Sequence, residues 1–520
     1  MKKNILVIGA GPAGLTAAYE LLRDGRSSVH EVTVLEESQR LGGISCTVNH
    51  HGNRMDMGGH RFFTKVPEVN AWWDMMLPRQ GSPSFDDRLL KREATLAPCG
   101  PDPDTTDCVM LSRHRVSRIL FNGKFFDYPI TLKASTIKNM GIFTTMKAGS
   151  SYLLSSVHKK QENSLEDFYI NRFGKKLYYM FFEHYTENLW GRHPSQIDPS
   201  WGAQRVKGVS IKAVLQNAAR KAIHLKRKGE VETSLIEEFS YPKLGPGELW
   251  EITADKIEKM GGKILKGYKV EKLHRDETGR ITALTCEHHG QKERLSGDIV
   301  ISSMPLKDLT AGLENVPPEL QAIGAGLPYR DYMTVGILTR KLNLENKTSI
   351  PTLGGIVPDN WIYVHDRSVK MGRLQIYNNW SPYMVQDPEH TVWMGLEYFC
   401  NEGDELWSLA DQDFARLGIS ELLSLKLIDS AEDVLDSHVE RVKKAYPAYF
   451  DTYIQIDALI DFLNGIDNLY CVGRNGQHRY NNIDHSMCTA FEAVKNILTG
   501  CKDKSNIWNV NTEKEYHETK

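Results

Sequence analysis

The stretch NILVIGAGPAGLTAAYELL, residues 4–22, decides the fold class of this chain. An apolar run, the spacing Gly9-x-Gly11-x-x-Gly14 and a run of helix-forming residues predict a strand, a tight turn and a helix. Gly9 permits the turn, Gly11 lets the backbone approach a pyrophosphate, and Gly14 lets the helix pack closely on the strand. The helix start presents unpaired N–H groups to phosphates. The stretch therefore predicts a dinucleotide site.

A second predicted strand, HEVTVLEES at residues 30–38, carries the acidic partner of this turn. It ends at Glu36, where a carboxylate can accept hydrogen bonds from both ribose hydroxyls. Glu37 is the neighbouring candidate, although strand alternation turns one of the two side chains away. A glycine-rich turn without a ligand would not account for the strand, the helix and the acidic residue together.

The next segment, SQRLGGISCT at residues 38–47, places Arg40 before the pair Gly42 and Gly43. This resembles the FAD-dependent oxidoreductases of the amine oxidase and phytoene desaturase type, in which the arginine and glycines continue along the cofactor. An NAD dehydrogenase would not need a second glycine-rich turn. The resemblance therefore implies FAD as the cofactor.

Two later segments complete the FAD domain that this resemblance implies. Residues 261–309 read as strand, hairpin and strand, and the resemblance places backbone near Val270 against the adenine. In residues 468–498 a strand ends at Gly473 and a helix follows a short loop. We expect this helix to begin near Asp484 or Ser486, since both are good N-cap residues. Its positive end would stabilise negative charge on a reduced flavin.

The segment DMGGHRFFTK, residues 56–65, combines two glycines with an imidazole. Gly58 and Gly59 would let the chain approach the isoalloxazine ring, with His60 near its reactive face. The alternative is a structural histidine in a glycine loop, and the FAD context favours the flavin-facing position. Here the sequence resembles the UDP-galactopyranose mutases, whose members carry Gly-(Gly/Pro)-His-x-x-Phe at this point.

Further segments resemble the mutases in the same order along the chain: residues 181–207, 327–338, 361–384 and 473–486. The resemblance implies a substrate site formed by Tyr185, Thr186, Trp190, Arg205, Arg330, Tyr363, Asn378, Arg479 and Tyr480. Two arginines, Arg205 and Arg330, would bind a diphosphate, which an amine or polyene substrate does not need. Alternatives stay open: a surface ion pair for Arg330, a solvated basic face for Arg205, and a core position for Trp190.

The cofactor-binding residues that these resemblances imply form one longer set. They are Gly9, Gly11, Pro12, Ala13, Gly14, Glu36, Glu37, Arg40, Gly42, Gly43, Gly58, Gly59, His60, Val270, Gly473, Arg474, Asp484, His485, Ser486 and Met487. The catalytic residues implied are His60, Arg205 and Arg330.

The mutase resemblance implies an FAD-dependent pyranose/furanose isomerase acting on a nucleoside-diphosphate hexose. The reaction would be redox-neutral, with N5 of reduced FAD attacking the anomeric carbon, and NAD(P)H is a candidate external reductant. The alternative is an oxidoreductase that passes hydride from an amine, a porphyrinogen or a polyene to FAD. It would need an apolar or aromatic tunnel. A third class, a flavin-bound regulatory protein without turnover, leaves the arginines and tyrosines unexplained.

The expected fold class is α/β, with a Rossmann-like FAD-binding domain, an inserted helical domain and an antiparallel substrate sheet. The FAD-binding domain is expected to comprise residues 1–65, 246–305 and 465–504. We expect the helical insert at residues 130–225 and the substrate sheet at residues 226–245 and 306–400. Residues 80–113 have turn composition and are expected to form a mobile surface loop, and residues 505–520 a polar tail that frays.

The amino-acid composition limits the partners, the compartment and the metal or membrane sites that we expect. A formal net charge of -2 on 520 residues gives no global field for nucleic acid or an anionic membrane. The 8 cysteines form no CxxC pair, which argues for a reduced, cytoplasmic protein without a metal site. No uncharged apolar run is long enough to span a membrane, and residues 142–157 are expected to pack as an ordinary domain helix rather than rest on a membrane surface. A homodimer is compatible with this composition.

Overall fold

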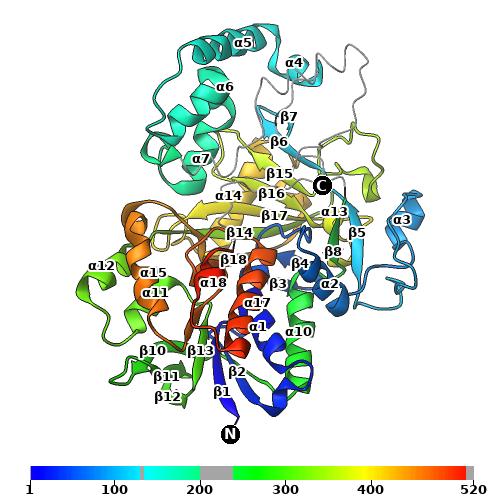
Figure 1. Cartoon of the computed structure of the whole chain (residues 1–520). Coiled ribbons are helices and arrows are strands. Elements are labelled where there is room, and N and C mark those ends of the chain that lie inside the picture. The colour runs from blue at the N-terminus through cyan, green and yellow to red at the C-terminus, as the bar shows by residue number, and fades with distance from the viewer. Residues whose placement is uncertain (1, 129, 131–133, 200–237, 511–520) are drawn as a thin grey trace, which may run out of the picture.

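The computed structural model describes residues 2–128, 130, 134–199 and 238–510. Figure 1 shows a parallel sheet with its helices at one end of the molecule, a large sheet in the middle, and the helices α4–α7 at the other end. The candidate site lies where the parallel sheet meets the large sheet.

The parallel sheet has the strand order β19-β13-β1-β2-β9. Its strands are β1 (Lys3–Ile8), β2 (His30–Glu36), β9 (Lys263–Lys266), β13 (Ile299–Ser302) and β19 (Leu469–Cys471). All neighbouring pairs are parallel, and Val7 faces Val34 on one side and Ile301 on the other. Three separate parts of the chain therefore build one sheet, which confirms the predicted fold class.

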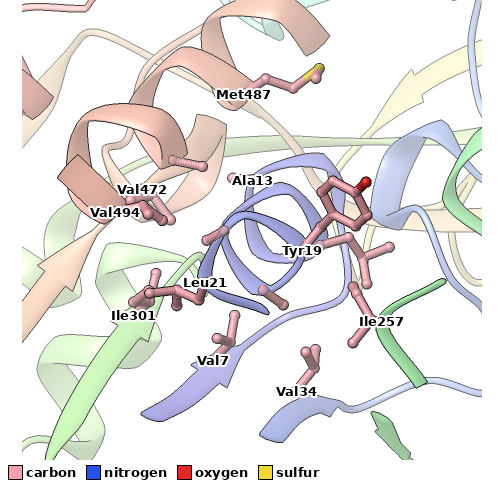
Figure 2. Close-up of a cluster of buried hydrophobic side chains, with 14 of the residues drawn as sticks. Val7, Ala13, Tyr19, Leu21, Val34, Ile257, Ile301, Val472, Met487 and Val494 are labelled. Atoms are coloured by element: carbon pink, nitrogen blue, oxygen red, sulfur yellow. The ribbon is translucent and has the colours of Figure 1, made fainter. Parts of the chain in front are cut away.

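Helix α1 (Pro12–Leu22) is buried on nearly all sides because it lies between the sheet, α10 (Gly247–Lys259) and α17 (Ile483–Thr499). Figure 2 shows Ala13 and Leu21 of α1 packed among apolar side chains of these neighbours. A Cβ on Gly14 would lie 1.9 Å from the carbonyl oxygen of Gly9. The predicted packing reason for this glycine is confirmed.

A three-stranded antiparallel sheet follows the parallel sheet in the chain. It comprises β10 (Lys269–Arg275), β11 (Ile281–His288) and β12 (Gln291–Ser296). The helices α11 (Leu306–Gly312), α12 (Pro318–Gly326) and α15 (Ile456–Asn464) share its apolar core.

The large sheet has seven strands in the order β18-β14-β17-β16-β15-β6-β7. They are β6 (Ser117–Phe121), β7 (Lys124–Asp127), β14 (Tyr329–Thr339), β15 (Trp361–Val364), β16 (Arg373–Ile376), β17 (Val392–Cys400) and β18 (Val434–Pro447). The strands expected within residues 306–400 are present. The sheet also takes β6, β7 and β18 from outside that range, and β15 pairs with β6 in parallel. Helix α14 (Asp411–Ser424) covers one face.

The described part of the helical insert contains α4 (Ala134–Met140), α5 (Ile142–Val157), α6 (Leu165–Phe181) and α7 (Glu183–Trp190). Helix α6 is interrupted at Gly174, whose φ is +80°. The predicted catalytic residue Arg205 lies outside the described residues. None of the described helices combines the length and the apolar character needed to cross a bilayer.

The segment 80–113 differs from the mobile loop that we expected. It contains α3 (Phe85–Leu90) and most of β5 (Met110–His114), which pairs with β8 (Glu238–Pro242). Strand β8 was expected in the substrate sheet and lies in this two-stranded sheet instead. The buried carboxylate of Asp86 forms ion pairs with Arg92 and Arg113. Buried ion pairing orders a segment whose composition resembles that of a loop.

Four short helices and one hairpin complete the described chain. They are α2 (Pro67–Met76), α13 (Tyr377–Trp380), α16 (Gly473–Gly476), α18 (Ser505–Trp508) and the hairpin of β3 (Thr47–His50) with β4 (Asn53–Asp56). The start of the expected polar tail is packed rather than frayed, because Ile507 and Trp508 are buried. The indole of Trp508 donates to Oδ1 of Asn464 at 2.7 Å.

Candidate active site

The turn between β1 and α1 is tied to the end of β2. The backbone N–H of Ala10 donates to Oε2 of Glu36 at 2.8 Å, and Ser38 donates to Oε1 from its N–H and its hydroxyl. Glu36 is therefore buried and oriented, whereas Glu37 is exposed. Of the two carboxylates that we considered, Glu36 is the one fixed at the turn.

A side chain at position 11 would meet much less of the protein than one at Gly9 or Gly14. Gly9 has a φ of +95°, and a Cβ there would lie 2.3 Å from the hydroxyl of Ser303. Gly11 has an ordinary φ of -83°, and a Cβ would come no closer than 3.8 Å to Gly43. No described atom requires glycine at position 11, so the bare backbone at the start of α1 leaves space for a ligand. That space fits a pyrophosphate.

Gly11→Ala is expected to lower FAD affinity by about tenfold or more, because the methyl group fills this space. The melting temperature of the flavin-free protein should not change. Flavin titration of the apoprotein and thermal melts measure the two quantities. Gly14→Ala is the matched comparison, since its Cβ meets the protein itself and should destabilise the apoprotein. Equal FAD affinity in Gly11→Ala and wild type would contradict the assignment.

Arg40 and the glycine pair after it continue the same surface. Gly42 and Gly43 both have positive φ, +98° and +55°. Arg40 forms a two-point ion pair with Glu440 of β18, at 2.9 and 2.8 Å. The predicted contact of Arg40 with the cofactor stays a prediction, and the structure shows which carboxylate holds its guanidinium.

The glycine–histidine loop follows β4. Gly58 has a φ of +103°, which favours glycine, but a Cβ on Gly59 would lie 2.4 Å from the indole ring of Trp361. The protein itself therefore requires Gly59 to be glycine. Nε2 of His60 lies 2.8 Å from the carbonyl oxygen of Ile44, and burial lowers the pKa of His60 to about 4. The ring is neutral at neutral pH, donates from Nε2 and leaves Nδ1 as an acceptor.

Asp56, immediately before this loop, is fully buried. Its carboxylate accepts hydrogen bonds from the hydroxyls of Thr47 and Tyr241, and burial raises its pKa to about 7. The folded protein therefore holds this proton more tightly than the unfolded chain, whose aspartates have a pKa of about 3.9. The contribution of this group to the free energy of unfolding is largest below about pH 4, and it is lost as the pH rises through about 7.

Asp56→Asn is therefore expected to stabilise the protein increasingly from pH 5 to pH 8, by up to about 4 kcal/mol. The amide resembles the protonated acid and cannot become a buried anion. Urea unfolding of both proteins at several pH values gives the difference in the free energy of unfolding. The exposed Asp24, changed to Asn, is the control, and it should show no such trend. A difference independent of pH would contradict the raised pKa.

The C-terminal motif brings Arg474 toward the same loop. Gly473 has a φ of +78°, and its N–H donates to the hydroxyl of Thr489 at 2.8 Å. Nη1 of Arg474 donates to the carbonyl oxygen of Asn481 at 3.2 Å. Nε and Nη2 of Arg474 are buried and have no partner among the described residues. Buried, unpaired guanidinium donors favour an anionic ligand at this point.

The helix α17 begins at Ile483, next to the predicted start near Asp484. Its N-cap is Asn482, which forms a capping box with His485, so the two N-cap candidates Asp484 and Ser486 were wrong. Asp484 accepts from the hydroxyl of Thr64 at 2.8 Å, and Ser486 donates to Asn481 at 3.1 Å. Both side chains make tertiary contacts that their cap propensity did not reveal.

A group of residues from the large sheet and α7 lies close to Arg474, and we call it the Arg373 cluster: Tyr185, Trp361, Tyr363, Arg373, Glu397 and Tyr446. Nε of Arg373 donates to the hydroxyl of Tyr185 at 2.9 Å, and Nη1 donates to Glu397 and to the hydroxyl of Tyr446, both at 3.1 Å. The guanidinium of Arg474 lies 5.2 Å from the ring of Tyr446 and 4.2 Å from that of Tyr480. The two arginines therefore flank one tyrosine, Tyr446.

Further unpaired donors surround this cluster. Nη1 of Arg61 and the hydroxyl of Tyr332 are buried and have no partner among the described residues. A Cβ on Gly58 would lie 3.6 Å from that same hydroxyl. Stacked aromatic rings belong to the same region. The ring centres of Tyr363 and Tyr128 are 4.2 Å apart.

Sequence reasoning named Tyr185, Tyr363 and Tyr480 but missed Arg373, Glu397 and Tyr446. Arg373 and Glu397 lie directly opposite each other on β16 and β17. The available signal was one charged residue inside each of two otherwise apolar strands, RLQI and VWMGLEYFC. Such residues are rarely buried unless they are paired.

The structure gives other predicted substrate residues contacts of a different kind. The guanidinium of Arg330 donates to the carbonyl oxygens of Asn188, Leu189 and Phe399, and so holds the end of α7. Arg479 donates to carbonyl oxygens of residues 508 and 510, and Asn378 to carbonyl oxygens of residues 388 and 391. Thr186 and Trp190 are buried in the helical core. Their contacts with a substrate stay predictions.

One group of possible metal ligands lies away from this site. Nε2 of His50 and Nδ1 of His51 lie 3.1 and 2.8 Å from Oδ2 of Asp436. The cysteine count and ligand spacing did not reveal it, because Asp436 is distant in sequence. Hydrogen bonds between the imidazoles and the carboxylate account for the grouping without an ion.

Comparison with known proteins decides the family. The family model described as flavin containing amine oxidoreductase matches residues 12–474, most of the chain. The chain belongs to this family of flavin enzymes. FAD is therefore its cofactor, and the turn at Gly11 and the carboxylate of Glu36 fit it.

Individual members differ in their chemistry. Over 69 residues the chain is 36% identical to a coproporphyrinogen III oxidase of Mycobacterium tuberculosis, a match that covers 13% of this chain and 15% of that protein. A crystal structure of reduced UDP-galactopyranose mutase is similar over 98% of this chain and 97% of the other, with a TM-score of 0.74 and 20% identity. Cyclohexylamine oxidase from Brevibacterium oxydans is similar over 97% and 100%, with a TM-score of 0.59 and 13% identity. Likeness at these identities shows the fold.

Proposed function

We propose that this flavoprotein interconverts the pyranose and furanose forms of a nucleoside-diphosphate hexose. The observation that carries the proposal is that the buried Arg373 and the half-buried Arg474 both contact Tyr446. Arg474 keeps two unpaired donors, and bidentate donors of this kind suit a diphosphate. Tyrosine hydroxyls beside them suit a sugar.

The charge of the site disfavours an amine substrate. The aromatic faces of Tyr446 and Tyr480, which could stabilise a cation, already face the guanidinium of Arg474. A protonated amine would add a further positive charge near Arg373 and Arg474, and Glu397 is already paired with Arg373. A polyene would leave the unpaired donors unsatisfied.

The protein groups at the site hold and orient rather than exchange protons. His60 is neutral, and burial raises the pKa of Tyr446 to about 12, so its hydroxyl stays a donor at neutral pH. Burial likewise raises the pKa of the Tyr185 hydroxyl. Reduced FAD, when bound, supplies the nucleophile that a redox-neutral ring isomerisation requires. NAD(P)H is the proposed external reductant.

The second candidate is an oxidoreductase acting on a polycarboxylate such as a porphyrinogen. The partial match to a coproporphyrinogen III oxidase favours it, and the same arginines would pair with carboxylates. This reaction would reduce FAD, which an electron acceptor such as oxygen would then reoxidise, whereas the isomerisation has no net oxidation or reduction.

The test compares both reactions on one preparation. The dithionite-reduced protein is incubated without oxygen with UDP-, dTDP- and GDP-hexopyranoses, and the products are separated by chromatography. We expect a furanose product only from the reduced protein. Peroxide formation with coproporphyrinogen in air tests the second candidate. Turnover of coproporphyrinogen without any furanose product would overturn the mutase proposal.

A further inference from the structure

Helix α5 exposes an apolar face at the end of the molecule opposite the parallel sheet (Figure 1). Six large apolar side chains on it are each between 64% and 80% exposed: Ile142, Phe143, Met146, Leu153, Leu154 and Val157. Their spacing places them on one side of the helix. We call this set the α5 stripe. The sequence predicted that this helix packs inside a domain. In the structure, only the side of α5 opposite the α5 stripe is packed against other helices.

The orientation of α5 is fixed by that packed side. Ala148 is buried against the helical core, and the interruption of α6 at Gly174 allows the backbone of Tyr152 to approach. A Cβ on Gly174 would lie 2.7 Å from the backbone nitrogen of Tyr152. The α5 stripe therefore cannot turn inward without disrupting this contact.

The formally charged residues in the stretch of sequence that contains α5 are all lysines. Residues 128–161 contain five lysines and no aspartate or glutamate, whereas the whole chain has 66 acidic residues in 520. Lys138, Lys147 and Lys159 are exposed, and Lys147 lies on α5 itself. An exposed apolar stripe flanked by lysines matches the boundary between lipid headgroups and acyl chains of an anionic bilayer.

We propose that the α5 stripe binds the surface of an anionic phospholipid membrane. The apolar side chains would enter the acyl boundary, and the lysines would contact the negatively charged headgroups. The helix lies in the plane of the surface and does not cross it. The hydroxyl of Tyr185 on α7, in the same group of helices, accepts a hydrogen bond from Nε of Arg373, so this group of helices adjoins the candidate active site. The inference does not depend on which substrate the enzyme takes.

The experiment uses the full-length, FAD-loaded protein and sedimentation with sucrose-loaded vesicles. One set of vesicles is phosphatidylcholine, and the other contains one-third phosphatidylglycerol. We expect binding to the anionic vesicles that weakens with added salt, and much weaker binding to the neutral vesicles. Absence of wild-type binding to the anionic vesicles would overturn the proposal.

Two variants separate the apolar and charged contributions. The double variant Phe143→Asp/Leu154→Asp should bind about tenfold or more weakly, because two exposed apolar side chains become anionic. Lys147→Gln/Lys159→Gln should weaken binding to anionic vesicles by about fivefold per lysine. Ile454→Asp is the matched control, since Ile454 is 81% exposed but lies outside the α5 stripe, and it should bind as wild type does.

Two further outcomes would also overturn the inference. Unchanged vesicle binding in Phe143→Asp/Leu154→Asp would place the contact elsewhere. Sedimentation velocity without lipid tests whether a second copy of the chain binds the α5 stripe. Self-association of wild type that is lost in Phe143→Asp/Leu154→Asp would show that a second copy, and not a membrane, covers the stripe.

Discussion

Arg474→Gln is expected to raise the dissociation constant for UDP by about 100-fold, because two charge-assisted donors to a phosphate are lost. Nε and Nη2 of Arg474 have no hydrogen-bond partner among the described residues, so neither atom gives up a hydrogen bond within the protein to bind the ligand. Glutamine retains a donor but removes the positive charge. Titration of UDP against the reduced protein, followed by flavin absorbance, measures the change.

Arg479→Gln is the matched control for this variant. Arg479 belongs to the same motif, but its guanidinium is engaged with backbone carbonyl oxygens beyond α18. It should lower stability and leave UDP affinity unchanged. The flavin content of each variant must be measured as well. Loss of FAD from Arg474→Gln with unchanged UDP affinity would show that Arg474 holds the cofactor and not the substrate.

Glu397→Ala is expected to destabilise the protein by about 3–5 kcal/mol, because it leaves the buried guanidinium of Arg373 without its counter-charge. Glu397 is fully buried, lies 3.1 Å from Arg373 and also accepts from Gln375 at 2.7 Å. Removal of the carboxylate exposes neither group to water. Urea unfolding followed by tryptophan fluorescence gives the difference in free energy.

The double variant Arg373→Met/Glu397→Gln tests whether the cost comes from the unpaired charge. Removal of both charges should recover a large part of the stability that Glu397→Ala loses. The double variant should still bind FAD, yet bind UDP more weakly than wild type if Arg373 contacts the substrate. An equal loss of stability in Glu397→Ala and in the double variant would assign the effect to packing rather than to charge.

The parallel sheet and its nucleotide turn were predictable because their causes are local. A strand, a positive-φ glycine and a helix that needs a bare Gly14 lie within residues 4–22, so neighbouring residues specify them. Glu36 was predictable from its place at the end of the next strand. A further reason for glycine at position 59 was not predictable, because the indole of Trp361 that excludes a side chain there is distant in the sequence.

The missed features all depend on contacts between distant segments. Strand β18 reads as a polar segment, DSHVERVKKAY, and becomes the edge of the large sheet only by pairing with β14. The segment 80–113 has loop composition, and its order depends on the ion pairs of Asp86. Neither pairing leaves a periodic pattern in the residues themselves.

By itself, the sequence determined that this chain builds a parallel sheet from three pieces of chain with a nucleotide-binding turn after its first strand, because backbone conformation at glycines and strand ends depends on nearby residues. Only the tertiary structure decided which charged groups meet at the site. Arg330 holds the end of α7, whereas Arg373 and Arg474 flank Tyr446, and the α5 stripe faces outward. The direction of a side chain depends on how strands and helices from distant parts of the chain pack together, and residue order does not record that packing.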